Sequence, residues 1–164
     1  MMYAIRGARA TIDDPEAVLT TAREWAASHG GEVLLADARA VFGRDHLESA
    51  VRHALRAKEA GRMAARSLPL EALRYLSGSR QVSDAIRLAG IRPGTSEIAI
   101  LAFGDLPIEA WCRTLGWSID DSVLEPGGKS LKPLSIGDME ASTVPEDRRY
   151  DLALERVALL DVRT

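Results

Sequence analysis

Apolar positions along the chain alternate between short continuous runs and longer stretches with three- and four-residue spacing. The runs have the length of β-strands, and the spaced stretches have the pattern of amphipathic helices. The predicted strands cover residues 3–10, 33–36 (with 38–42 as a candidate extension) and 98–103, and the predicted helices cover residues 15–29, 45–61, 70–76, 80–89, 107–115 and 145–160. Because strands and helices alternate, we expect one α/β or α+β domain over residues 1–164, with a mixed β-sheet packed against several helices.

Residues that favour helix ends support several of these boundaries. Asp14 precedes Pro15, a typical N-cap followed by a proline at the first helical position. Asp45 and Glu48 have the spacing of a capping box, with Asp in place of the usual Ser or Thr. Gly90 is a natural residue to end the helix before it. Residues 118–137 are rich in Gly, Pro, Ser and charge, and we expect mostly a mobile loop there.

Composition and charge narrow the class of protein. The 164 residues are 46% hydrophobic and 27% charged, which is ordinary for a globular domain, and the net charge is −3. Residues 1–43, 44–92 and 93–164 carry net charges of −2, +5 and −6. A single positive segment in an acidic chain predicts a basic surface for nucleic acid, or simply a solvated helix face. Of the basic residues, 18 are Arg, whose planar fork suits phosphate groups.

Nothing in the sequence indicates a membrane or an oxidising compartment. No apolar run approaches the roughly 20 residues that cross a bilayer, and the first residues lack a signal-peptide pattern. The only cysteine, Cys112, excludes an internal disulfide framework and is expected in the core. We therefore expect a cytoplasmic protein without membrane contact.

Two short motifs suggest chemistry but lack the residues that it needs. EPGGKS (125–130) resembles a phosphate-binding loop, but Val123 stands where that motif requires glycine, so a flexible turn is favoured. Ser77 and Ser79 flank Gly78 without the second glycine of a hydrolase nucleophile elbow, and a helix cap is favoured. The three histidines lack ligand spacing, so we expect no metal, no cofactor and no catalytic residue.

The stretch RYLSGSRQVSDAIRLAG (74–90) carries the most specific surface prediction. Its apolar residues follow the i, i+3, i+4, i+7 pattern of one helix face. Arg80 and Asp84 lie on the opposite face, with the spacing of an ion pair. Unpaired amides at the helix start, beside Arg80 and Gln81, predict a site for an anion or an RNA backbone.

One family matches these residues in order and spacing. The stretch DHLESAVRHALRAKEAGRMAARSLPLEALRYLSGSRQVSDAIRLAGI (45–91) and the terminal ERVALLDV (155–162) resemble the kinase-associated small subunit of the KEOPS (EKC) complex, in its archaeal form. KEOPS makes threonylcarbamoyladenosine beside the anticodon of tRNA. The resemblance implies a non-catalytic subunit that binds the complex's small atypical kinase/ATPase. It also implies recruitment of tRNA, including its 3′ CCA end, to the metal-dependent transferase subunit.

The resemblance and the charge pattern together give two sets of candidate site residues. For tRNA they are Arg62, Arg66, Arg74, Tyr75, Ser77, Gly78, Ser79, Arg80 and Gln81. For the kinase they are Leu154, Val157, Leu160 and Val162. Core packing is the competing interpretation for Tyr75 and for the last helix. The competing functions are an adaptor that regulates a kinase without touching RNA, and a small phosphate-binding enzyme.

Overall fold

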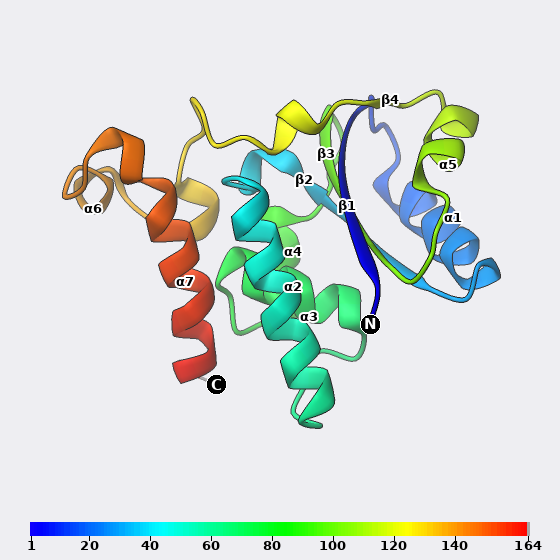
Figure 1. Cartoon of the computed structure of the whole chain (residues 1–164). Coiled ribbons are helices and arrows are strands. Elements are labelled where there is room, and N and C mark those ends of the chain that lie inside the picture. Colours follow the sequence, from blue (N-terminus) through cyan, green and yellow to red (C-terminus); the bar gives the residue numbers. More distant parts are fainter. Residues whose placement is uncertain (164) are drawn as a thin grey trace.

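The computed structural model describes residues 1–163 and contains a four-stranded sheet (Figure 1). The strands are β1 (Tyr3–Arg9), β2 (Glu32–Asp37), β3 (Glu97–Phe103) and β4 (Ser118–Ile119). Their order is β2-β3-β1-β4, and all three pairings are antiparallel. The expected mixed sheet is therefore wrong in one respect: β1 and β2 run in one direction and β3 and β4 in the other, so every neighbouring pair is antiparallel.

The helices lie on both faces of this sheet, with α1 and α5 on one side and α2, α3, α4 and α7 on the other (Figure 1). Their bounds are α1 (Pro15–Ser28), α2 (Arg44–Glu59), α3 (Leu68–Ser77), α4 (Val82–Ala89), α5 (Ile108–Leu115), α6 (Asp138–Ala141) and α7 (Tyr150–Arg163). Short 3-10 turns complete the fold: η1 (Ala38–Ala40), η2 (Asp121–Leu124), η3 (Lys132–Leu134) and η4 (Glu146–Arg148). This confirms a single α+β domain. In residues 1–163 no helix has the length and apolarity to span a bilayer.

The central strand β3 divides the interior into two cores. Successive side chains of a strand point to opposite faces, so the continuous apolar run of β3 serves both. Leu101 and Phe103 pack with the helices α2, α3, α4 and α7, while Ile98 and Ile100 pack with α1 and α5. A third cluster holds the 131–136 segment against the start of α7; it consists of Phe42, Leu131, Leu134, Ile136, Leu152 and Ala153. That segment is thus packed against the domain, and residues 118–137 are mostly loop, as we expected, apart from β4 and the turns η2 and η3.

The helix ends show where local sequence signals succeed. Asp14 caps α1 by accepting from the backbone N–H of Ala17 at 3.2 Å, as predicted. The capping box at Asp45 is wrong, because Gly43 at φ 103° is the N-cap of α2 and offers no side chain. The proposed extension of β2 is also wrong, since the Asp37 carboxylate accepts from the Arg39 N–H and turns the chain into η1.

Candidate functional site

The Gly/Ser turn after α3 ends that helix; it does not begin the next one. Gly78 adopts a left-handed conformation, with φ at +68°. Its N–H donates to the carbonyl of Tyr75 at 3.2 Å, and the N–H of Ser79 donates to the carbonyl of Arg74 at 3.0 Å. The hydroxyl of Ser77 donates to the same Arg74 carbonyl, so it does not accept from a free amide as we expected. Glycine is the residue that adopts this conformation without strain, which explains Gly78.

The start of α4 is open. Gln81 is its N-cap residue, but no side chain in residues 1–163 caps the first turn of α4. Arg80 and Gln81 are both exposed beside these amides. The expected Arg80–Asp84 ion pair is wrong, because Asp84 instead lies 3.6 Å from the guanidinium of Arg87. Arg80 therefore presents its charge to solvent at a helix N-terminus.

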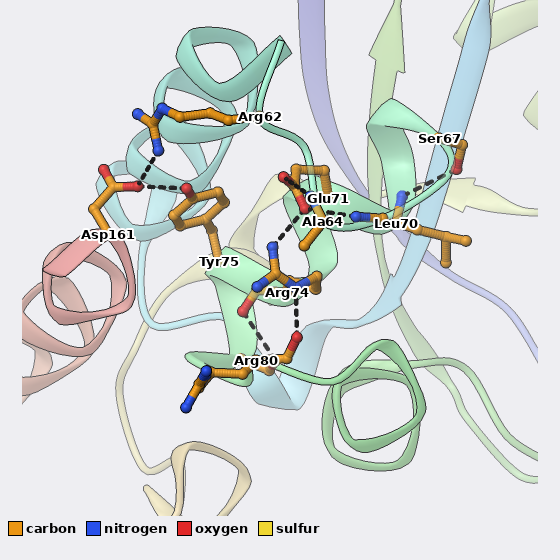
Figure 2. Close-up of polar contacts among 11 residues, drawn as sticks. Arg62, Ala64, Ser67, Leu70, Glu71, Arg74, Tyr75, Arg80 and Asp161 are labelled. Carbon is orange, nitrogen blue, oxygen red and sulfur yellow. Dashed lines mark hydrogen bonds and ion pairs between the residues drawn. The ribbon is translucent and has the colours of Figure 1, made fainter. Parts of the chain in front are cut away.

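A buried ion pair lies behind this turn (Figure 2). Nη1 of Arg74 donates to Oε1 of Glu71 at 2.6 Å, and the two side chains are only 2% and 1% exposed. Glu71 also accepts from the backbone N–H groups of Ala64 and Ala65, at 3.0 and 3.2 Å. Nε of Arg74 donates to the carbonyl of Arg80 at 2.7 Å. One pair of side chains thus ties the segment before α3 to the turn after it.

The structure separates the tRNA candidates into an exposed set and a buried set. Arg62, Arg66, Arg80 and Gln81 are exposed, and Gly78 and Ser79 are partly exposed. Arg74, Tyr75 and Ser77 are buried and hydrogen-bonded inside the domain. The expectation that these three side chains contact RNA directly is therefore corrected. They hold the turn in place instead, because each one bonds to a neighbouring main chain or helix.

Asp161 on α7 gathers three side chains from other elements (Figure 2 shows two of them). Its carboxylate accepts short hydrogen bonds from Tyr75 and His53 and lies 3.6 Å from Nη1 of Arg62. Burial alone would raise the pKa of Asp161, but the hydrogen bonds from Tyr75 and His53, together with nearby positive charge that includes Arg62, lower that pKa on balance. Burial, followed by the bond to Asp161, raises the pKa of Tyr75 to about 12. Sequence reasoning missed Asp161, since a single acid on a helix carries no local signal.

Helix α7 also lies directly against the turn. A Cβ built on Gly78 would come within 3.2 Å of Cβ of Arg156 on α7. Val157 and Leu160 are buried in the core that α7 shares with α2 and α3. Of the four kinase candidates, Leu154 is partly exposed and Val162 is 82% exposed. Core packing is thus confirmed for Val157 and Leu160, and only the outer face of α7 is accessible to a partner.

His46 on α2 has a structural role beside this turn. The N–H of Phe42 donates to Nδ1 of His46 at 3.0 Å, and Nε2 of His46 lies 2.9 Å from the carbonyl of Leu76. Since a carbonyl can only accept, Nε2 carries the proton. Complete burial lowers the pKa of His46 to about 4. His46 therefore stays neutral at pH 7 and holds the end of α3 just before the turn.

The lysine of the GGKS loop shows whether this loop can bind phosphate as a P-loop does. Nζ of Lys129 donates to the carbonyls of Ala38, Val41 and Val123 at 2.8, 2.6 and 2.7 Å. Burial lowers the pKa of Lys129 to about 8. All three donors of the ammonium are directed at main-chain oxygens, so this lysine cannot hold a phosphate as a P-loop lysine does. The segment forms a turn, as we expected, and its lysine side chain anchors it to three main-chain carbonyls.

Comparison with known families supplies the decisive observation. Residues 17–121 match the family model described as kinase binding protein CGI-121. The chain belongs to this family. The matched region runs from α1 to the start of η2 and contains the ion pair, the Gly78 turn and α4. None of the curated proteins compared with the chain matches it. The family description supports a protein that binds a kinase.

Proposed function

We propose that this protein is a non-catalytic, cytoplasmic subunit of a KEOPS-type complex that makes threonylcarbamoyladenosine in tRNA. In this role it binds the small atypical kinase/ATPase subunit and the 3′ CCA end of tRNA, and it brings the tRNA to the transferase subunit. It works without a cofactor. Membership of the CGI-121 family supports the kinase partner. The resemblance to the KEOPS small subunit extends this to the complex and to RNA.

The open start of α4 is the observation that carries the RNA part of the proposal. The first-turn amides of α4 lack a side-chain cap, and Arg80 and Gln81, which directly precede that turn, are both exposed. Helix N-termini attract phosphate groups, and RNA ends are held by contacts to backbone and bases together. Arg62 and Arg66 are exposed on the segment that Glu71 ties to this turn, and they add positive charge.

The outer face of α7 is the proposed contact for the kinase. Val162 is 82% exposed, and Leu154 is partly exposed on the same helix. An apolar side chain that is open to solvent at the end of a helix is suited to a protein interface. The inner face of α7 is buried in the core, so the kinase and the core use opposite sides of one helix.

A binding experiment with two tRNA substrates tests the RNA part. Purified protein is titrated with intact tRNA and with tRNA that lacks its CCA end, at several salt concentrations. We expect tighter binding of the intact tRNA and an affinity that falls with salt. Arg80→Glu should weaken binding while the melting temperature stays unchanged. Arg113→Glu, a reversal at an exposed residue of α5 on the other face of the sheet, is the matched control.

Two results would contradict the proposal. Equal affinity for intact and truncated tRNA would remove the CCA role. Kinase capture without any retention of RNA would instead identify an adaptor that regulates the kinase alone. Unfolding of the Arg80→Glu variant would show that Arg80 is structural, and Gln81→Glu would then carry the same test at the neighbouring exposed position.

A further inference from the structure

A cleft on the α4 side of the domain is not used by the proposed function. It encloses about 690 Å³, within the range of small-molecule sites. Three segments that are distant in sequence form its walls: the end of β2 with η1, the C-terminal end of α4 with the segment leading to β3, and loop 127–133. The cleft lies at the opposite end of α4 from the Gly78 turn, because its α4 lining is Arg87 and Leu88.

The cleft is positively charged in a protein with a net charge of −3. Its cationic lining consists of Arg39, Arg87, Arg92, Lys129 and Lys132, against the two acids Asp37 and Glu97. Lys129 contributes charge from below the surface, since its ammonium group is hydrogen-bonded to three carbonyls. The exposed Arg and Lys side chains of the cleft are accessible to a ligand.

Two of the guanidinium groups are held in position by the protein. Nε and Nη2 of Arg39 donate to the carboxylate of Asp37 at 3.3 and 3.0 Å. Nη2 of Arg92 donates to the carbonyl of Arg87 at 2.9 Å. Each guanidinium keeps further N–H groups that can donate to a ligand. Fixed forks of this kind suit the oxygens of phosphate groups.

Loop 127–133 adds main-chain donors to the same wall. Within the described residues, the N–H groups of Gly127, Gly128 and Ser130 donate to no protein acceptor, and all three residues are exposed. A Cβ built on Gly127 or Gly128 would meet no atom within 4 Å, so the main chain here is open to a ligand. Amides along such a turn form concave sites for anions.

We propose that this cleft binds the phosphate groups of a ligand, through the Arg39, Arg92 and Lys132 side chains and the Gly127–Gly128 amides. The phosphate comes either from a free nucleoside polyphosphate or from an RNA strand. The GGKS lysine does not contact the phosphate directly, since its ammonium group donates to three main-chain carbonyls. The inference stands apart from the proposed function, because neither Arg80 nor α7 takes part in it.

Calorimetric titration with inorganic pyrophosphate, ATP and tRNA tests the cleft. The cleft variant is Arg92→Gln with Lys132→Gln, and both residues are exposed. The matched control is Arg23→Gln with Arg113→Gln, which removes two exposed charges from α1 and α5 on the other face of the sheet. We expect pyrophosphate to bind the wild type and the control equally. The cleft variant should lose about tenfold in affinity, the factor that corresponds to 1.4 kcal/mol.

Competition then identifies the source of the phosphate. If pyrophosphate displaces tRNA, and the cleft variant also weakens tRNA binding, the ligand is an RNA strand. If ATP and pyrophosphate bind while tRNA is unaffected, it is a free nucleotide. Amide chemical shifts of Gly127 and Gly128 in the wild type give a readout that needs no variant. Unchanged amide shifts on adding pyrophosphate, or an equal loss of pyrophosphate affinity in the cleft and control variants, would overturn the proposal. This outcome is independent of the effect of Arg80→Glu on tRNA affinity.

Discussion

Arg74→Met should destabilise the domain far more than its position in a helix suggests. The substitution leaves the Glu71 carboxylate, 1% exposed, without its cationic partner, which donates at 2.6 Å in the wild type. Removing one member of a buried ion pair costs about 3–5 kcal/mol, a large part of the roughly 5–15 kcal/mol that stabilises a typical domain. The carbonyl of Arg80 loses its donor in the same step. We therefore expect a loss of about 4 kcal/mol.

The double variant Glu71→Gln with Arg74→Met separates the charge from the packing. A neutral Gln at position 71 still offers an oxygen to the N–H of Ala64 or Ala65, and no charge remains buried. The double variant should therefore be more stable than Arg74→Met alone by about 2 kcal/mol. Urea denaturation followed by circular dichroism measures both values, provided that the m value is unchanged.

The same double variant also tests the link to RNA. Its fold is kept, but the carbonyl of Arg80 has no donor from α3, so the turn is less well held. We expect weaker binding of tRNA at a temperature well below the melting transition, because a remaining cost of about 2 kcal/mol lowers the melting temperature by only several degrees. A cost below about 1 kcal/mol for Arg74→Met, or a double variant no more stable than the single one, would refute the reasoning from burial.

Three further predictions concern other parts of the domain. The pKa of His46 lies near 4 in the folded state and near 6.5 in the unfolded one. Neutral His46 therefore contributes about 3 kcal/mol to the free energy of unfolding above pH 6.5, and this contribution is lost as the pH falls towards 4. The stability of His46→Gln, measured by denaturation over this range, should depend less on pH than that of the wild type. Lys129→Met leaves three carbonyls without a donor and should cost about 2 kcal/mol or more in thermal denaturation, whereas Lys132→Met should be neutral. Val162→Glu should abolish kinase capture without changing the melting temperature, whereas Leu160→Ala should cost about 2–5 kcal/mol, and unchanged capture by Val162→Glu would place the kinase elsewhere.

The hydrophobic pattern was sufficient for the longer elements of the fold, because burial decides them, but it missed the two-residue strand β4 and the four-residue helix α6. The run at 98–103 became the central strand β3, and the stripe around Ala85 and Ala89 became α4. Cap chemistry was less informative where backbone geometry decided instead. At α2, Gly43, with φ at 103°, is the N-cap residue, a position that we expected Asp45 to occupy.

The candidate site was harder to predict, because residue type does not determine exposure at any single position. Arg is mostly exposed in proteins, so Arg74 was interpreted as a surface contact. Yet Arg74 lies in a helix whose neighbours Leu73, Tyr75 and Leu76 are all buried, and Glu71 stands three residues before it. An Arg among such neighbours with an acid at i−3 indicates a buried pair more than an RNA contact. Arg80 meets neither condition, since its neighbours Ser79 and Gln81 are not buried and residue 77, three positions before it, is a serine. The same criterion that removes Arg74 from the proposed RNA surface is therefore consistent with Arg80 as a candidate contact.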